Sequence, residues 1–526
     1  MNENSLHIVD LLIIIVFLIL PILVGIKFAK KQKDTTTYFT AGGNIPAWAV
    51  GLSILATLIS SITFLAYPGE GFSSNWILLV QGLMVPLTLV FFIGFVAPLY
   101  RKTIKISAYE FFEKRFGFGA RVYSSLAFFL AHFSKMGTVF FLIALAFSEM
   151  TGFNTVEMIW ILGVIIIFIT LIGGIEAVIW MDVIQGIMLI GGGLLAFGII
   201  IFSTEGGLPA IWRVAEENGR TGFGPYSFDL VELTLFVMIL NGIFYAIQKY
   251  GTDQTIVQRY LTAKSDKAAI KASLIGVLMS VPVWALFMFI GTALFAYYQI
   301  NAGALPEGTP PDAVFPYFIM TELPVGVIGL VLAALLAAAI STLDSDLNCL
   351  SAIVTQDFYV RFKPHSAEKQ RMFVGKSVVV IAGLASMFIA MYYLTQGGEG
   401  VLGIVFTLYS IFSGGIAGLF LLGIFTKRAN KQGAYAGIAA CILFTAYAVL
   451  TSTEFAWPGR EPKLLLDFGE YNYTHHKMLL GVYSHIVLFV VGYIVSLFFK
   501  TPGNVEHLAY AGWRRSRETV QPVGIN

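Results

Sequence analysis

Charged residues are scarce in this chain of 526 residues. They make up 12% of the sequence, whereas hydrophobic residues make up 57%. Soluble domains carry about 25% charged residues, so roughly half of the usual surface charge is missing. Apolar runs of about 20 residues are long enough to cross the hydrocarbon core of a bilayer. The composition therefore excludes an ordinary soluble protein and predicts an all-α integral membrane protein.

Cysteine is scarce as well, and several functional signatures are missing from the sequence. The two cysteines, Cys349 and Cys441, both lie in apolar segments, which excludes a disulfide framework and a zinc pattern. The net charge of +2, without a basic tract that contains aromatic residues, argues against a nucleic-acid partner. No Walker A motif occurs, so ATP-driven pumping has no phosphate-binding loop.

Thirteen apolar segments are predicted to span the membrane, with boundaries good to a few residues. They are 8–29, 45–67, 75–99, 121–149, 156–175, 180–203, 231–255, 272–299, 323–357, 373–395, 401–425, 432–452 and 476–499. The first segment lacks the basic start and the small-residue cleavage site of a signal peptide, so we expect it to be retained as a span. None of the connections between the segments is predicted to form a soluble sensor or signalling domain.

The connections alternate in charge. Every second one is basic, among them "KFAKKQKD" and "QRYLTAKSDKAAIK", whereas the others, such as "YPGEGFSSN" and "LTQGGEG", are poor in lysine and arginine. Basic connections stay in the cytoplasm, so thirteen spans place the N-terminus outside and the C-terminus inside. The expected location is the plasma (inner) membrane.

The stretch "ILATLISSITFLAYPGEGF", residues 54–72, places several hydroxyl side chains in an apolar segment. Such hydroxyls commonly bond back to a carbonyl one turn earlier or hold neighbouring helices together. Their density, and the Pro68-Gly69 that follows, favour instead an unwound section in the middle of the membrane. Freed carbonyls in such a section can coordinate a sodium ion or a solute.

A second polar face lies in "AALLAAAISTLDSDLN", residues 333–348. Residues spaced i, i+3, i+4 and i+7 share one face of a helix, and here they are Ala338, Ser341, Thr342 and Ser345. Small residues admit a close neighbouring helix, and their oxygen atoms suit hard cations. Asp344 and Asp346 lie about 30 Å from the outer end of the span. We therefore expect them near the inner boundary, either as solvated interfacial acids or as cation ligands.

Asp182, in "WMDVIQG", begins a predicted span. As an acid near a helix N-terminus it complements the helix dipole. A carboxylate that enters the helix bundle at this depth could equally serve a cation.

Polar side chains also lie deep in the span 121–149, where "LAHFSKMGT" contains His132, Ser134 and Lys135. Lys135 is too deep to reach water comfortably, and no acid in the same span offers a partner. It either belongs to a buried ion pair or contacts an anionic or polyhydroxylated solute. Another span breaks at a Gly-Thr in "IQKYGTDQTIVQR", which adds Gln248, Lys249 and Tyr250.

Four stretches resemble the sodium:solute symporter family, which includes sodium/glucose cotransporters and bacterial galactose and sialic acid symporters. They are "PAWAVGLSILATLISSITF", "GGIEAVIWMDVIQG", "YGTDQTIVQRYLTAKS" and "AAAISTLDSDLN". The resemblance runs from the first span through the twelfth. The sialic acid branch is the most similar, through "SSITF", "SAYEFFEKRF" and the "HFSK" region.

The resemblance implies a leucine-transporter-like fold, in which two five-helix repeats are inverted in the membrane. Residues 1–526 would form a single transmembrane transporter domain. Its expected parts are an extra span at 8–29, the repeats at 45–203 and 231–425, C-terminal spans at 432–499 and a cytoplasmic tail at 500–526. The hydroxyl-rich stretch and "IQKYGTDQ" would be the paired helix interruptions of a site near the membrane midplane.

The resemblance also implies sodium ligands, carried over residue by residue. One sodium ion would be held by backbone carbonyls and hydroxyls of Ala56, Ile59, Ala338, Ser341 and Thr342. Some members hold a second sodium, and the matching positions are Asp182, Ser341, Asp344 and Ser345. Relatives usually carry serine or threonine where this chain has Asp344. The extra carboxylate could strengthen the second site, bind a proton or change the site, so the sodium count stays open.

The solute contacts that the resemblance implies are Ser60, Thr63, Gln81, Lys135, Gln248, Lys249 and Tyr250. Lys135 stands where the sialic acid branch has an arginine, and Ser60 and Thr63 agree with that branch. Gln81 is displaced from the position of the expected acid or amide. Two lysines that face one cavity favour an anionic solute such as a sugar acid or a carboxylate.

We therefore expect a sodium-coupled secondary active symporter, not an enzyme, that imports a sugar or sugar acid such as sialic acid by alternating access. Sodium would be a coupling ion rather than a catalytic cofactor. The expected partners are the solute, sodium ions and the lipid bilayer, with no nucleic acid and no obligate protein partner. A neutral sugar and a monocarboxylate or vitamin-type anion are alternative solutes. A channel would need rings of like residues along a pore, and a membrane enzyme would need a His/Asp or paired-acid constellation; the sequence shows neither.

Overall fold

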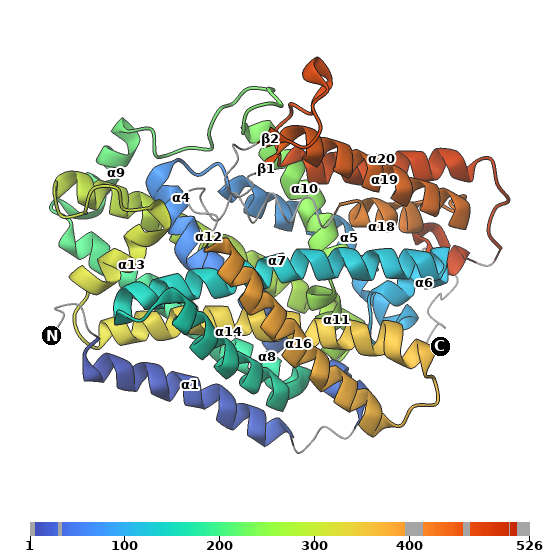
Figure 1. Ribbon diagram of the computed structural model, residues 1–526, viewed down its shortest axis with the longest axis horizontal. Helices are drawn as coiled ribbons and strands as arrows, with labels where there is room; N and C mark the ends of the chain where they lie inside the picture. Colours follow the sequence, from blue (N-terminus) through green and yellow to red (C-terminus); the bar gives the residue numbers. More distant parts are fainter. Residues whose placement is uncertain (1–5, 30–33, 395–413, 456–462, 504, 513–526) are drawn as a thin grey trace, which may run out of the picture.

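The computed structural model describes residues 6–29, 34–394, 414–455, 463–503 and 505–512. This part of the chain is almost entirely helical, with one short antiparallel strand pair, β1 (Glu454–Phe455) and β2 (Lys463–Leu464). Many of the long helices run along the longest axis of the molecule (Figure 1).

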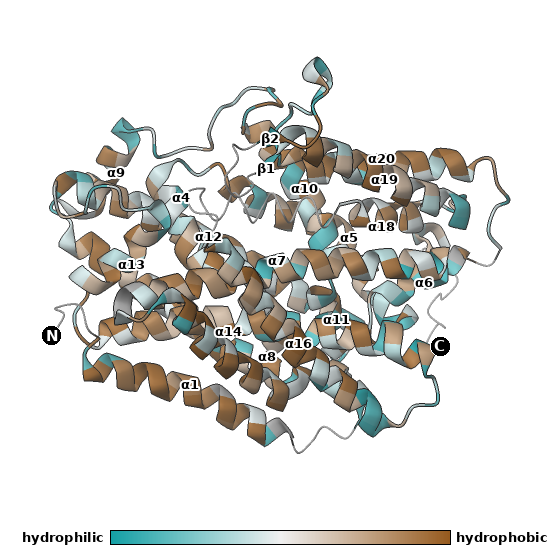
Figure 2. Ribbon diagram, viewed as in Figure 1, coloured by the Kyte–Doolittle hydropathy of each residue, from teal (hydrophilic) through white to brown (hydrophobic). Residues whose placement is uncertain are grey.

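Nine helices in the described residues are long and apolar enough to cross a membrane. They are α1 (Ile8–Ala29), α5 (Leu79–Thr103), α7 (Phe118–Thr151), α8 (Thr155–Ser203), α12 (Asp266–Ile300), α14 (Val327–Ile353), α16 (Glu368–Tyr393), α19 (Lys431–Ser452) and α20 (Leu479–Ser496). Figure 2 shows apolar residues along these helices and hydrophilic residues mainly near their ends. Large apolar side chains such as Phe91 and Phe202 are exposed, as expected where a helix faces lipid.

Helix α8 accounts for two of the predicted spans. Its 49 residues are interrupted at Gly174, where φ is 61° and ψ is 173°. At 1.5 Å per residue the helix would be about 74 Å long, more than twice the hydrocarbon thickness of about 30 Å. The break lies at the predicted connection between 156–175 and 180–203, so the two predicted segments correspond to the two halves of α8.

The hydroxyl-rich stretch forms a broken helix, as predicted. Helix α3 (Ala47–Leu58) ends before Ile59, and a π-helical turn η2 (Ile62–Ala66) leads into α4 (Tyr67–Ser73). The two arms meet at a bend of 59°. The bend lies at Ile59–Ser60 rather than at the proline. Pro68 stands in the first turn of α4, where a helix does not need its missing N–H.

The second predicted interruption is present as well. Helix α10 (Leu235–Gly251) ends at the Gly-Thr pair, and α11 (Gln254–Thr262) begins two residues later. The side chain of Asp253 caps α11 by accepting a hydrogen bond from the Thr255 N–H. A carboxylate at this position satisfies a free N–H and complements the helix dipole.

The remaining elements are shorter. Between the spans lie α2 (Thr35–Thr40), α6 (Tyr109–Phe116), α9 (Gly207–Glu217) and α13 (Pro311–Glu322), with the short turns η1 (Ala41–Gly43) and η4 (Gly469–Tyr471), and η5 (Glu506–Leu508) follows α20. The π-helical turn η3 (Val354–Tyr359) and α15 (Val360–Phe362) continue α14, and α18 (Ile416–Phe425) is the described end of the predicted span 401–425. Figure 1 shows α9 and α13 at one end of the molecule and α6 at the other. The start of the predicted span 401–425 lies outside the described residues. The count of thirteen spans and the boundaries of the two repeats stay predictions.

Helices α4 and α12 touch through glycines. A Cβ added at Gly71 would lie 2.1 Å from the Met288 carbonyl oxygen, and one added at Gly291 would lie 2.0 Å from that of Pro68. Both contacts are with backbone atoms, which cannot rotate away. The glycines therefore bring the broken helix directly against α12.

We predict that Gly291→Ala destabilises the protein, because the new methyl group would force α4 away from α12. Overpacking of this kind costs about 1–3 kcal/mol, and the melting temperature in detergent measures it. Gly94→Ala on α5 is the matched control, since nothing lies within 4 Å of its added Cβ. Equal melting temperatures for the two variants would contradict the close contact.

Candidate functional site

A buried arginine, Arg259, joins four helices, two of which (α3 and α11) are arms of the broken helices. Arg259 of α11 donates from Nη2 to Asp182 Oδ2 of α8 and to Ser345 Oγ of α14, both at 2.8 Å. Its Nε donates to Ser53 Oγ of α3, also at 2.8 Å. The side chains of Arg259 and Asp182 are both 0% exposed. We refer to these four residues as the Arg259 cluster.

Asp182 has hydrogen-bond partners on both carboxylate oxygens. Ser341 donates to its Oδ1, and Ser53 and Arg259 donate to its Oδ2. Asp182 also lies eight residues beyond Gly174, about two turns into the second half of α8. The helix dipole acts mainly within the first turn, so the interpretation of Asp182 as a helix-terminal acid is wrong.

The expected ligands of the first sodium lie where α3 breaks and α14 passes. The helical ladder of α3 ends with the Ile59 N–H bonded to the Leu55 carbonyl at 3.0 Å, and Ile59 is extended. The next carbonyl, that of Ala56, therefore lacks the usual helical donor. Thr342 Oγ1 on α14 is buried without a hydrogen-bond partner among the described residues. An orphaned buried oxygen costs about 1–3 kcal/mol, which a bound cation would offset, so these residues fit a sodium ion.

Most of the expected ligands of a second sodium already accept hydrogen bonds. Asp182 accepts from Ser341, Ser53 and Arg259, and Ser345 Oγ accepts from Arg259 and lies 3.4 Å from Thr57 Oγ1. A second sodium at Asp182, Ser341, Asp344 and Ser345 stays a prediction, and such an ion would share these oxygens with Arg259. Asp344 is 2% exposed. It interacts electrostatically with Asp182 and Arg259, and its Oδ1 has no hydrogen-bond partner in the described part of the chain.

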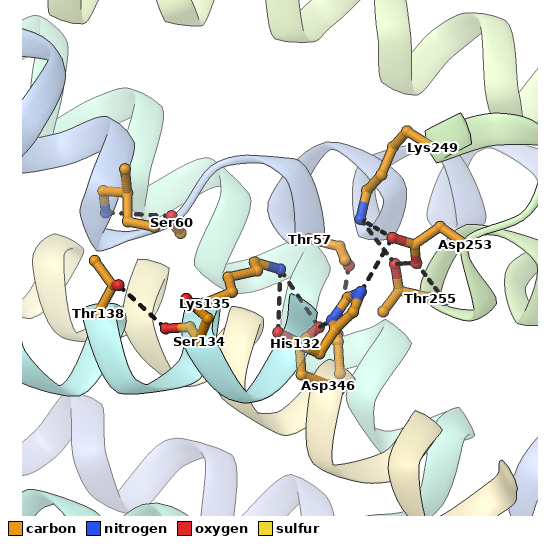
Figure 3. Close-up of polar contacts among 12 residues, drawn as sticks. Thr57, Ser60, His132, Ser134, Lys135, Thr138, Lys249, Asp253, Thr255 and Asp346 are labelled. Carbon is orange, nitrogen blue, oxygen red and sulfur yellow. Dashed lines mark hydrogen bonds and ion pairs between the residues drawn. The ribbon is translucent and has the colours of Figure 1, made fainter. Parts of the chain in front are cut away.

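A second buried cluster contains five charged or titratable side chains, and we call it the His132 cluster (Figure 3). From one end to the other its members are Lys135, Asp346, His132, Asp253 and Lys249. Lys135 Nζ lies 3.1 Å from Asp346 Oδ2, and Lys249 Nζ lies 2.7 Å from Asp253 Oδ2. His132 stands between the two carboxylates, 3.0 Å from Asp346 and 3.1 Å from Asp253. The cluster connects α7, α14 and the break between α10 and α11.

The His132 cluster decides one open question and corrects one expectation. Of the two alternatives for Lys135, the structure shows a buried ion pair, and the partner comes from α14, 211 residues away in sequence. Asp346 is not a solvated acid, because its side chain is 0% exposed. Asp344 is buried as well, so neither acid is solvated.

The other expected solute residues are all buried, at the two helix breaks or beside them. They are Ser60, Thr63, Gln81, Gln248 and Tyr250. Gln248 lines a small cavity together with His132 and Asp253. Ser134, next to Lys135, hydrogen-bonds with Tyr393 at 3.0 Å. In the described part of the chain, no hydrogen bond connects Gln81 or Tyr250 with the His132 cluster.

Sequence reasoning missed Arg259 and Asp253. The basic connection "QRYLTAKSDKAAIK" placed Arg259 in the cytoplasm, whereas the structure buries it completely. The available signal was Asp182, since a carboxylate inside the membrane requires a cation. Asp253 was part of a quoted motif. Its cap on α11 and its ion pair with Lys249 are local in sequence, whereas its contact with His132 appears only where α7 meets the break between α10 and α11.

A family model for the "Sodium:solute symporter family" matches residues 38–440. The chain belongs to this family. A sodium/sialic acid symporter of Aliivibrio fischeri is 32% identical over 489 residues, which are 92% of each protein. One from Proteus mirabilis is 37% identical over 434 residues, 81% of this chain and 86% of the relative.

A solved structure of a sodium-coupled sialic acid symporter, in a substrate-bound outward-open state with a novel sodium site, has the same fold. It superimposes with a TM-score of 0.84 at 32% identity, and covers 94% of this chain and 99% of its own. The expected leucine-transporter-like fold is therefore confirmed. The protein is a multi-pass membrane symporter of the sodium:solute family with sodium as its coupling ion, and it is a transporter rather than an enzyme.

We predict that Arg259→Met destabilises this symporter by about 3–5 kcal/mol, because it leaves the Asp182 carboxylate buried and unpaired. The double variant Arg259→Met/Asp182→Leu should recover part of this loss, since it removes both charges. Melting temperatures in sodium-free detergent solution measure both effects. Arg371→Met is the control, because its ion pair with Glu368 lies at the surface, where pairs contribute little. A double variant less stable than the single one would contradict the pairing.

Proposed function

We propose that this symporter imports an anionic sugar acid such as sialic acid across the plasma (inner) membrane, driven by sodium. The observation that carries the proposal is Lys135. Its side chain is 14% exposed, whereas those of Lys249, His132 and Arg259 are 5%, 2% and 0% exposed. Lys135 is therefore the most accessible cation of the two clusters. Its similarity in position to an arginine of the sialic acid branch supports the same class of solute.

The solute site would combine this cation with polar groups at the helix breaks. Ser60 and Thr63 lie at the break between α3 and α4, and Gln248 lies at the end of α10. Hydroxyl and amide groups suit a polyhydroxylated solute. A small monocarboxylate has only its carboxylate to bind, and the cation Lys135 alone would be enough for that. This combination favours a sugar acid over a neutral sugar and over a monocarboxylate or vitamin-type anion. Gln81, Lys249 and Tyr250 complete the proposed set.

The sodium ion would be held by the carbonyls of Ala56, Ile59 and Ala338 and the hydroxyls of Ser341 and Thr342. The charges around this site support a cation there. Asp182 is paired with Arg259, and the buried acid Asp344 lies near both. A sodium ion bound here would favour the ionised form of Asp344 and would be attracted by its charge.

Helix α14 provides a physical link between the two ligands. Ser345 belongs to the Arg259 cluster, and its neighbour Asp346 belongs to the His132 cluster. A ligand that shifts α14 at one cluster also shifts it at the other, so each ligand changes the affinity for the other. Alternating access would then move the two inverted repeats, 45–203 and 231–425, relative to each other.

The proposed orientation has the N-terminus outside and the C-terminus in the cytoplasm. The connections that contain α9 and α13 are poor in lysine and arginine relative to the one that contains α6, and Figure 1 shows them at opposite ends. The arrangement agrees with the positive-inside rule.

Uptake into proteoliposomes tests the proposed function. With an inward sodium gradient we expect the vesicles to accumulate labelled sialic acid above the external concentration, and collapse of the gradient should stop accumulation. Excess glucose or lactate should compete weakly. Uptake that survives loss of the gradient would exclude sodium coupling. Stronger competition by glucose or by lactate would replace the proposed solute with a neutral sugar or a monocarboxylate.

We predict that Ser341→Ala/Thr342→Ala raises the sodium concentration for half-maximal uptake by about tenfold or more, equivalent to about 1.4 kcal/mol of lost binding. The variant removes two proposed ligand oxygens. Ser280→Ala and Ser386→Ala are controls, because these buried hydroxyls bond only to carbonyls of their own helices in the described contacts. If the double variant keeps the wild-type sodium dependence, these hydroxyls do not bind the ion.

A further inference from the structure

His132 faces a carboxylate oxygen with each of its ring nitrogens. Nε2 lies 3.1 Å from Asp253 Oδ2 in hydrogen-bonding geometry, and Nδ1 lies 3.0 Å from Asp346 Oδ1. The Nδ1 contact is a close approach without the geometry of a hydrogen bond. A neutral imidazole has one N–H and one lone pair. One of these contacts would then set a lone pair against a carboxylate oxygen.

Asp253 is a carboxylate and not a carboxylic acid. Its Oδ1 accepts hydrogen bonds from the Thr255 N–H at 2.8 Å and the Thr255 hydroxyl at 2.5 Å. Its Oδ2 accepts from Lys249 Nζ at 2.7 Å. Every neighbour of these oxygens is a hydrogen-bond donor, so both oxygens act as acceptors and the carboxyl group carries no proton. The imidazole nitrogen that faces Asp253 must therefore carry a hydrogen atom.

Asp346 is held in the same form by Lys135. The ammonium group lies 3.1 Å from Oδ2 and 3.4 Å from Oδ1, and a cation at this distance favours the charged form of a carboxyl group. A lone pair on His132 Nδ1, 3.0 Å from Oδ1, would be repelled by this carboxylate, whereas a hydrogen atom there would be attracted to it. The geometry therefore favours a hydrogen atom on both nitrogens, which only the imidazolium ion carries.

We propose that His132 is a bound imidazolium whose proton gives the solute site one excess positive charge, so that the symporter prefers an anionic solute. In the His132 cluster three cations, Lys135, Lys249 and the imidazolium, face two carboxylates. The carboxylate of a solute bound beside Lys135 balances the one excess positive charge. Without the proton the cluster is neutral and has no electrostatic preference for an anion. This inference rests on the proposed import of a sugar acid.

The surroundings of His132 agree with a cation. The Phe128 ring stacks on the imidazole with 3.8 Å between centroids and 21° between planes, and an aromatic face attracts positive charge. The titratable side chains that face the cluster from each packed element are Lys135 on α7, Lys249 on α10, Asp253 before α11, Asp346 and Cys349 on α14, Tyr109 on α6, and Tyr245, Tyr250 and Tyr260 on α10 and α11. Neither carboxylate is free to balance His132, because each is also paired with a lysine.

The protonation of His132 can be read directly in the wild-type protein. In detergent at pH 7, with ¹⁵N-labelled histidine, the NMR signals of His132 should be those of an imidazolium with hydrogen on both nitrogens. Loss of these signals in His132→Gln assigns them. Signals of a neutral tautomer in the wild type would overturn the proposal. This measurement needs no solute, so its outcome is independent of the solute's identity.

The effect on specificity is measured by calorimetric binding of sialic acid and of its uncharged methyl ester at fixed sodium concentration. We expect His132→Gln to weaken binding of the acid by about tenfold or more, and binding of the ester by less than about twofold. His485→Gln is the control, because His485 is buried on α20 against Phe244, outside the cluster. A sodium-dependent rise in melting temperature shows that each variant is folded. Equal loss for acid and ester, or no loss for either, would overturn the proposal.

If His132→Gln does not fold, the wild-type protein still decides, because the NMR signals of a neutral ring would overturn the proposal. If the wild-type protein binds neither the acid nor the ester, the proposed function has failed, and the preference for an anion is overturned with it.

Discussion

A charge buried inside a membrane protein has to be balanced, either by the protein or by a ligand. The centre of this symporter contains two groups of such charges. Around Arg259 the guanidinium is paired with Asp182 and lies near a second buried acid, Asp344, and around His132 two lysines are paired with two aspartates. In the proposed function, sodium binds near the first group and an anionic solute binds beside the second, so each ligand meets charges of the opposite sign.

The two broken helices make these groups possible. Regular helices would use their carbonyls and N–H groups internally, and would leave little for a ligand. At Ile59 the chain leaves the helical conformation and frees the Ala56 carbonyl. At Thr252 a second break places Asp253 at the start of a new helix, where it accepts from a backbone N–H and meets Lys249 and His132.

The long apolar helices, both breaks and the hydroxyl face of α14 followed from the sequence, because apolar length and helical spacing are local properties. The i, i+3, i+4 pattern from Ala338 to Ser345 is visible without knowing what faces it. The ion pairs that join different helices are not local. Asp182 and Arg259 are 77 residues apart, and Lys135 and Asp346 are 211 apart, so no local pattern matches these partners. The sequence prediction placed Arg259 in the cytoplasm because basic residues mark cytoplasmic connections on average. A single basic residue can instead form an ion pair with a buried acid, as Arg259 does with Asp182.

The glycines along α12 have a consequence for how the molecule moves. Gly276 lies against Ile54 and the Gly51 carbonyl of α3, and Gly291 lies against Pro68 of α4. Helix α12 thus lies directly against both arms of the broken helix, α3 on one side of the bend and α4 on the other. The 59° angle between the two arms is therefore supported from one side by α12. Any motion that changes this angle would have to break the close contacts that α12 makes with α3 and α4.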